Sequence, residues 1–409
     1  MRLAWFRPSD EASALPFDDT PALVRALSAE HELDVFTETN AHDFVWRHFR
    51  VPYDLCVFEL DNTAAHRFVW PYLLEYGGVL LLRTRTLHNS RARALVHAGR
   101  LQHYVAEFTF DAGHPPYLAH GTDYIRSDDW PMLRVPVLAS RVTVATHPGV
   151  AQALQDEHPH ARVRCAPVPV HAGQPRRKNQ RPERSSGPEE VVFGVLANDR
   201  VDVARRAFAH AEQGSRSASL LIDEADAVME RADVILALHW PGFGTAQTLA
   251  LAAMGSARPV VVLETEASAD WPMLDPQSWR ARGLGFAPPV GVSVDLRDEE
   301  HSLGLAIRRL ALDEALRSRL GEAGRAWWQD HASVDAAAKA WRQLLREAAS
   351  LDRPARPTHW PAHLDVDGLE RAREILGEFG VSADLFLRIP EALKPPATLV
   401  AFRDPPGVA

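Results

Sequence analysis

Short apolar runs alternate with helical stretches along most of this chain. The runs at 2–6, 32–36, 54–60, 78–82 and 141–145 are rich in Val, Leu and Phe, and their apolar residues are nearly continuous. Such runs are typical of strands that are covered on both faces, as in a parallel sheet. The alternation therefore predicts a doubly wound α/β domain in the first part of the chain, with a helix that begins at an N-cap Thr20 and has Pro21 at its first position.

A second series of the same kind follows. It predicts strands at 191–196, 218–223, 233–238, 258–263 and 283–288. Two long helices, at 313–331 and 333–350, close the series. The whole chain is therefore expected to form two Rossmann-like doubly wound domains that face each other across a cleft, where the carboxyl ends of the strands bind ligands.

The segment between the two series has a different composition. Residues 171–190 hold no large apolar residue and carry a group of cations at 176–184. We interpret the segment as an exposed linker, and the alternative is a patch that contacts an anionic membrane or an acidic partner. The expected domains are thus 1–170, the linker, 191–350 and a tail, 351–409, with one short helix at 366–380.

Composition excludes several classes of protein. The formal net charge of −9 argues against a nucleic-acid groove. No apolar run has the length of a membrane span, and the first residues lack the apolar core of a signal peptide. Cys56 and Cys165 lie in strand-like runs and are expected to be buried, reduced thiols, so we expect a cytoplasmic protein. No zinc-ligand spacing occurs, and no metal site is expected.

The stretch from 239 to 263 has the layout of a phosphate-binding strand, turn and helix. Gly242 and Gly244 flank Phe243 in a turn whose backbone can close on a diphosphate. A helix that begins near Thr245 presents free N–H groups and a partial positive charge toward that turn. The chain also lacks the GxxxxGK[ST] motif of P-loop proteins, so Arg side chains and helix N-termini would have to hold any phosphate.

Three segments of the sequence, 1–36, 53–82 and 232–262, resemble the GT-B glycosyltransferases, and in detail the bacterial retaining family 4 (glycosyltransferase group 1) enzymes. The resemblance covers about residues 1–350. It implies a nucleotide-diphosphate-sugar donor held by the second domain and a hydroxyl acceptor held by the first. It implies no obligatory metal and no further cofactor.

On the donor side, the resemblance assigns binding roles to Arg200 and to the turn and helix start. Arg200 stands where the family places a basic residue that reaches the diphosphate, and a bidentate guanidinium there would stabilise the leaving group. The alternative for Arg200 is a surface residue at a helix start. The other residues matched to the donor site are Gly242, Phe243, Gly244, Thr245, Ala246 and Gln247.

On the acceptor side, Asn62 and His66 match the family's "GN…H" pattern. His66 could equally be a satisfied buried histidine. Arg83 and Thr84 stand where the family has a His-Asp pair, so Arg83 and the nearby His88 are the candidates for a catalytic role. The alternative for His88 is a solvated loop histidine.

Several features depart from the family pattern. No Asp or Glu occurs from Val234 to Leu263, so the carboxylate that normally holds the donor sugar is replaced by neutral groups such as Gln247. A single strand, 218–223, separates 191–196 from 233–238 where the family has two, so the second domain is one βα unit short. The loop before the first helix lacks the family's glycine and carries acids, which would repel a diphosphate if they faced it. These acids are Asp10, Glu11, Asp18 and Asp19.

The sequence therefore leaves two main hypotheses open. The first is an active glycosyltransferase with a narrowed donor pocket. The second is a non-catalytic GT-B-like protein that binds a nucleotide, a sugar or a partner glycosyltransferase. Another activity on the same fold, such as that of a nucleotide-sugar epimerase, is a third and weaker alternative.

Overall fold

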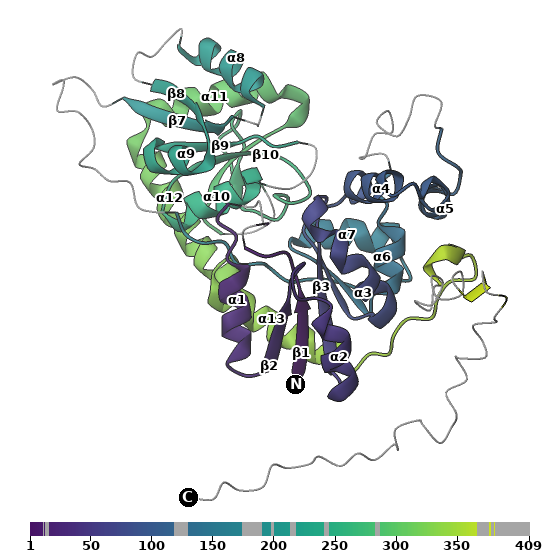
Figure 1. Cartoon of the computed structure of the whole chain (residues 1–409). Coiled ribbons are helices and arrows are strands. Elements are labelled where there is room, and N and C mark those ends of the chain that lie inside the picture. Colours follow the sequence, from purple (N-terminus) through teal and green to yellow (C-terminus); the bar gives the residue numbers. More distant parts are fainter. Residues whose placement is uncertain are drawn as a thin grey trace, which may run out of the picture. The chain divides into compact units, whose positions relative to one another are not determined.

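A computed structural model describes most of the chain (Figure 1). The described residues are 1–10, 12, 16–117, 130–173, 190–197, 200–212, 218–240, 245–282, 287–365, 376–377 and 380. Residues Met1–His359 form one compact unit, and Trp360–Ala409 form a second. Most of the expected linker and the expected tail helix at 366–380 lie outside the described residues.

The first sheet is built from the predicted apolar runs. Its strands are β1 (Arg2–Phe6), β2 (Glu32–Phe36), β3 (Leu55–Leu60), β4 (Val79–Leu82), β5 (Val142–Ala145) and β6 (Val163–Cys165). They pair in parallel in the order β2-β1-β3-β4-β5-β6. The chain changes direction across the sheet between β1 and β3, which is the position where doubly wound folds bind ligands.

Helices connect the strands of the first sheet. They are α1 (Thr20–Ser28), α2 (Asp43–Arg50), η1 (Ala64–Phe68), α3 (Val69–Tyr76), α4 (His88–His97), α5 (Leu101–Ala112), α6 (Arg134–Ala139) and α7 (Pro148–Glu157). The prediction that Thr20 caps α1 is wrong by one residue, because Asp19 is the N-cap and Thr20 is the first helical residue. Thr20 is instead buried, and its hydroxyl donates to the Asp18 carboxylate at 2.8 Å.

The second sheet has the same construction. Its strands are β7 (Val191–Leu196), β8 (Ala218–Asp223), β9 (Val234–Ala237), β10 (Val260–Leu263), β11 (Met273–Leu274) and β12 (Gly291–Val294), in the order β11-β12-β10-β9-β7-β8. The connecting helices are α8 (Val201–Glu212), α9 (Ala225–Arg231), α10 (Thr245–Gly255), η4 (Leu296–Asp298), α11 (Glu299–Leu312) and α12 (Glu314–His331). As predicted, β8 is the one strand that follows β7 and precedes β9 in the sequence, within the described part of the chain.

The strand expected at 283–288 is not found where it was predicted. Residues 283–286 lie outside the described residues, and the strand of this region is β12, which begins at Gly291. Pro288 and Pro289 precede it. Because proline has no N–H to donate to a neighbouring strand, regular pairing begins only after both prolines.

Helix α13 (Val334–Ala349) follows the second sheet in sequence but packs into the core of the first domain. It contacts α1 and β3, and Figure 1 shows it beside α1 and the first sheet. Trp341 of α13 is fully buried, and its ring centroid lies 4.9 Å from that of Trp5 in β1. A helix that was expected in the second domain thus completes the first.

The segment that connects the two domains, residues 167–173, is hydrogen-bonded to several other parts of the chain. Val170 N–H donates to Ala332 O, between α12 and α13, at 3.0 Å. Asp19 N–H, just before α1, donates to Pro169 O at 3.0 Å. Gly173 N–H donates to Ala252 O of α10, also at 3.0 Å. This connecting segment therefore ties elements of both domains together.

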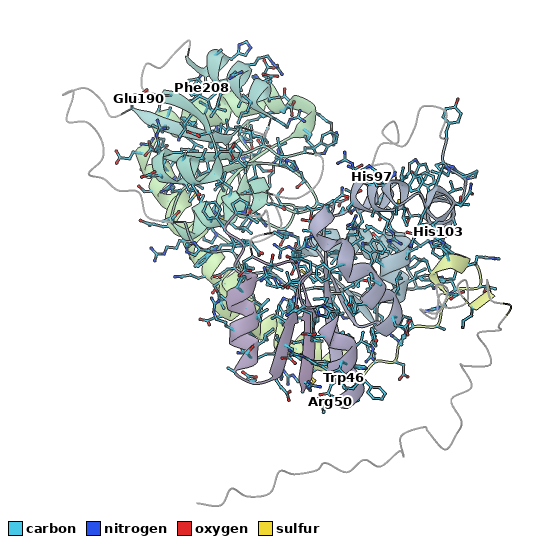
Figure 2. All side chains as sticks on the ribbon, viewed as in Figure 1. Trp46, Arg50, His97, His103, Glu190 and Phe208 are labelled. Carbon is cyan, nitrogen blue, oxygen red and sulfur yellow. The ribbon has the colours of Figure 1, made fainter. Side chains whose placement is uncertain are left out.

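The buried position of Trp341 predicts a large loss of stability when its ring is removed. Trp341→Ala would leave a cavity beside Trp5 and delete the hydrogen bond from the indole Nε1 to Pro167 O (3.0 Å). We expect the free energy of unfolding in urea to fall by about 3–5 kcal/mol. Trp46→Ala is the control, because Trp46 is 60% exposed on α2 (Figure 2) and its loss should change stability little. Equal losses for the two variants would contradict the packing described for α13.

Candidate functional site

A cavity of about 300 Å³ lies between the two domains. On the first domain it is lined by Arg83, which follows β4, and by Thr146 and His147, which follow β5. On the second domain it is lined by Gln247 and Thr248, near the start of α10. Two residues that the sequence singled out separately, Arg83 and Gln247, therefore share one cavity at the carboxyl ends of the first sheet's strands.

Arg83 is held by buried carboxylates. Its side chain is 5% exposed, and its Nη2 lies 3.0 Å from Oδ1 of Asp18, whose side chain is 4% exposed. Its Nε lies 3.8 Å from Oε1 of Glu59, a buried residue of β3. Burial alone would lower the pKa of Arg83, but the carboxylates of Asp18, Glu59 and Asp61 raise it. The guanidinium therefore stays charged in the cavity wall, and its charge is balanced from within the protein.

This arrangement changes the interpretation of the acidic loop before α1. Asp18 does not stand as an unpaired acid that repels a phosphate, because it pairs with Arg83. Asp10 likewise pairs with Arg7 Nη1 at 2.7 Å. Arg7 follows β1, and its Nε lies 3.8 Å from Glu59 Oε2. The acids thus balance two buried arginines at the carboxyl edge of the first sheet.

Asn62 and His66 follow β3, beside the point where the chain changes direction across the first sheet. Asn62 Oδ1 accepts the N–H of Ser90 at 2.8 Å and so satisfies a free donor in the first turn of α4. His66 is buried, 6% exposed, with its Nδ1 2.9 Å from Thr63 Oγ1. Burial and the nearby Arg83 and Arg7 lower the pKa of His66 to about 3, so the ring is neutral. Its Nε2 has no hydrogen-bond partner among the described residues.

The interpretation of His88 as a solvated loop histidine is wrong, because the residue lies in a helix and is buried. It is the first residue of α4 and is 1% exposed. Its Nδ1 lies 2.8 Å from Trp130 O and its Nε2 lies 3.1 Å from the Tyr104 hydroxyl. Burial lowers the pKa of His88. The sequence around it is polar, but aromatic residues of α5 enclose the ring, and it does not line the cavity.

Arg200 lies at the corresponding position of the second sheet. It follows β7, and its guanidinium carbon lies 6.0 Å from the ring centroid of Trp240, which follows β9. Its Nη2 pairs with Glu299, the first residue of α11. β7 and β9 are neighbours at the point where the chain reverses across this sheet, where ligands bind. Gly242, Phe243 and Gly244 lie outside the described residues, as do the side chains of Thr245 and Ala246.

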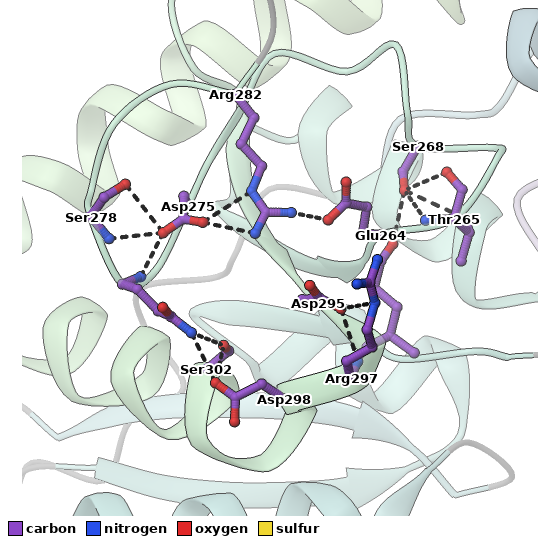
Figure 3. Close-up of polar contacts among 12 residues, drawn as sticks. Glu264, Thr265, Ser268, Asp275, Ser278, Arg282, Asp295, Arg297, Asp298 and Ser302 are labelled. Carbon is purple, nitrogen blue, oxygen red and sulfur yellow. Dashed lines mark hydrogen bonds and ion pairs between the residues drawn. The ribbon is translucent and has the colours of Figure 1, made fainter.

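A polar network covers the carboxyl ends of β10, β11 and β12 (Figure 3). Glu264 directly follows β10, one residue beyond the acid-free stretch that the sequence showed. Its carboxylate pairs with Arg282, whose Nη2 lies 2.8 Å from Asp275 Oδ2. Two carboxylates therefore balance Arg282, which lowers its capacity to attract a phosphate. The sequence did not single out Glu264, although its place directly after an apolar strand marks it as an edge residue.

Other residues of the cavity wall were missed or misjudged. Cys165 was expected to be buried, but it is exposed, because β6 is a short edge strand that pairs only with β5 in the described sheet. Trp271 and Trp327 form an aromatic wall, with ring centroids 5.3 Å apart. Trp327 packs against the core of the second domain, and its ring also lines the cavity.

Two further findings concern metals and membranes. Within the described ranges, no group of three or more His, Cys, Asp or Glu side chains has a geometry suited to a metal ion. In the same part of the chain, no helix combines the length and the apolar character that crossing a bilayer requires.

Comparison with solved structures identifies the fold. No protein-family model matches the sequence, and no curated protein matches it. Among solved structures, sucrose-phosphate synthase from Thermosynechococcus elongatus aligns with 85% of this chain and 98% of its own, with a TM-score of 0.54 and 14% identity. The chain has the GT-B fold. The expectation of two parallel-sheet α/β domains is confirmed.

Further GT-B structures align over similar lengths with lower scores. A glycosyltransferase from Rickettsia africae aligns with 85% of this chain and 98% of its own, at 9% identity and a TM-score of 0.49. The catalytic domain of starch synthase IV from Arabidopsis thaliana aligns with 85% and 99%, at 12% identity and a TM-score of 0.48.

The lowered pKa of His66 predicts a pH dependence of stability. The unfolded chain binds a proton at this residue below about pH 6.5, whereas the folded GT-B protein does so only near pH 3. The stability that the fold gains from holding His66 neutral is fully present above pH 6.5 and is lost as the pH falls toward 3. Between pH 7 and pH 5, His66→Gln should therefore lose less stability than the wild type, by about 2 kcal/mol.

Urea unfolding at the two pH values measures this difference. His42→Gln is the matched control, because the His42 side chain is 76% exposed. The same loss between pH 7 and pH 5 in the wild type and in His66→Gln would show that His66 is not held neutral in the fold.

Proposed function

We propose that this protein transfers a sugar from a nucleotide-diphosphate-sugar donor to a hydroxyl acceptor, at the cavity between its two domains. The observation that carries the proposal is the position of that cavity. It is bounded by Arg83, His147 and Cys165 at the ends of β4, β5 and β6, and by Gln247 near the start of α10. A sucrose-phosphate synthase shares the fold, and sugar transfer is extended from it to this chain as part of the proposal.

In this proposal the donor diphosphate binds at the N-terminal end of α10. The free N–H groups of a helix start favour an anion there, and Arg200 lies on the neighbouring strand end. Gln247 would give a neutral hydrogen bond to the donor sugar in place of a carboxylate. Transfer of a hexosyl group with retention of configuration rests on the family resemblance alone.

Arg83 is the proposed catalytic residue of the first domain. A fixed cation in a wall with little water stabilises negative charge that develops as the sugar–phosphate bond breaks. Asp18 and Glu59 hold the guanidinium in place, so its position costs no rearrangement during the reaction. His88 is left out of this proposal, because its ring is enclosed by Tyr104 and Trp130.

A second candidate function is binding of a nucleotide or a sugar without catalysis. One observation favours it: the charges of both candidate arginines are already matched by carboxylates. Arg83 pairs with Asp18, and Arg200 pairs with Glu299. An anionic donor would have to compete with these carboxylates, which weakens the electrostatic stabilisation that transfer requires.

Calorimetric titration with UDP, GDP and their common sugar conjugates tests the donor site. We expect one conjugate to bind, and Arg200→Ala to weaken that binding tenfold or more, because hydrogen bonds to charged groups contribute about 1.5–3 kcal/mol. Gln343→Ala, at an exposed position of α13, is the control and should bind as the wild type does. A folded protein that gives no heat with any nucleotide would remove the donor and with it the proposed transfer.

Mass spectrometry of the bound conjugate then separates the two functions. Cleavage of the sugar from the nucleotide, slowed at least tenfold in Arg83→Gln, supports transfer. Tight binding with no cleavage over many hours supports the binding protein.

A further inference from the structure

We infer that the cavity between the domains binds a neutral, ring-shaped compound with one or two hydroxyl groups, such as a phenol or another aromatic alcohol. The ligand class follows from the walls of the cavity. The role of that ligand as the sugar acceptor rests on the proposed function.

One wall of the cavity is aromatic. The rings of Trp271 and Trp327 lie 5.3 Å apart, and the His331 ring stacks on Trp327 with centroids 4.3 Å apart and an interplanar angle of 7°. The lining also includes Val168 of the connecting segment and Ala336 of α13. The Trp271 and Trp327 rings are tilted by 53° to each other. An apolar aromatic wall of this kind favours an aromatic ring, which gains free energy from burial against it.

The charges around the cavity disfavour an anion. Among the described residues that line the cavity, Arg83 is the one Lys or Arg, and Asp18 and Glu59 balance its charge. Burial and Arg83 lower the pKa of His147 to about 4, so that ring is neutral at pH 7. Asp270 and Asp330 are exposed lining residues, so they lie where the cavity meets solvent. A phosphate or carboxylate would therefore pass two acids and would meet no cation without a carboxylate partner among the described lining residues.

Besides Arg83 and the two acids, the described walls carry a few neutral polar side chains. Gln247, Thr248 and Thr146 line the cavity, and the Thr146 hydroxyl already lies 2.8 Å from His147 Nδ1. A hexose carries several hydroxyl groups, and each one left unpaired in an apolar cavity costs free energy. A ring with one or two hydroxyls matches the available partners better.

The volume of the cavity also favours a small ring-shaped compound. About 300 Å³ is at the lower end of the range for small-molecule pockets. It suits a compound of one or two rings and is too small for a whole nucleotide-diphosphate sugar. The occupant is thus distinct from the donor, whose diphosphate is proposed to bind at the start of α10.

Cys165 provides a direct reporter of occupancy. It lines the cavity and is exposed, whereas Cys56 is buried. We would measure alkylation of Cys165 by iodoacetamide at pH 8.5, by mass spectrometry, with 2-naphthol, glucose or inorganic phosphate present. We expect saturating 2-naphthol to slow alkylation at least fivefold, and glucose and phosphate to leave it unchanged. Protection by glucose or phosphate but not by 2-naphthol, or by none of the three, would overturn the inference.

A larger side chain that fills the cavity should abolish the binding of 2-naphthol. Calorimetry is expected to show that Ala336→Trp loses 2-naphthol binding, while Gln343→Trp, at an exposed position of the same helix, keeps it. If Ala336→Trp does not fold, Trp327→Ala replaces it, and the loss of the aromatic wall should weaken binding at least fivefold. Unchanged binding in a folded variant of either kind would place 2-naphthol outside this cavity and refute the inference.

The outcome is separable from that of the proposed function. Protection by 2-naphthol in a protein that binds no nucleotide would leave the ligand class standing and remove the acceptor role. Donor cleavage in a protein whose Cys165 only glucose protects would leave sugar transfer standing and overturn the ligand class.

Discussion

The connecting segment, residues 167–173, is the constraint on which the arrangement of the two domains depends. Its backbone groups bond to the loop before α1, to the junction of α12 and α13, and to α10. Two tryptophans add to these bonds, because Trp328 Nε1 donates to Val170 O at 3.1 Å and Trp341 Nε1 donates to Pro167 O at 3.0 Å. Pro167, Val168 and Val170 are also part of the cavity wall. The same segment therefore joins the domains and shapes the site between them.

The buried charges of the first domain are tied to this segment. Asp18 forms an isolated antiparallel bridge with Val170, and its carboxylate pairs with Arg83 in the cavity wall. Taking charges out of water is costly, and removing one partner of such a pair leaves the other uncompensated. A change in the connecting segment would thus reach Arg83 through Asp18. This link explains why a guanidinium can be held at a defined position in a largely apolar cavity.

A second contact between the domains lies away from the connecting segment. Arg85, which follows β4, pairs with Glu266, which follows β10, and with Glu157 at the end of α7. The backbone of Gly149 in α7 approaches Glu266 so closely that a Cβ on Gly149 would lie 2.1 Å from the Glu266 carbonyl oxygen. Glycine is needed here because any side chain would separate the two backbones. The cavity thus lies between domains that also touch outside the connecting segment.

The sequence by itself determined the local elements. Continuous apolar runs predicted β1 to β5 and β7 to β10, because a strand covered on both faces needs apolar residues at successive positions. The spacing of these runs was enough to predict two sheets and the single strand between β7 and β9. Arg83 and Gln247, which line the cavity, were located by the resemblance to the GT-B glycosyltransferases and not by the spacing of the runs.

Only the tertiary structure decided the remaining features. The return of α13 to the first domain, the burial of His88 under α5, the pairing of Asp18 with Arg83 and the exposure of Cys165 all depend on segments distant in sequence. The aromatic wall of Trp271 and Trp327 also depends on two segments that are distant in sequence. Periodicity is a local property, whereas burial and ion pairing are set by what packs against a residue from elsewhere in the chain. The sequence therefore determined which elements form, and packing between them decided the chemistry of the cavity.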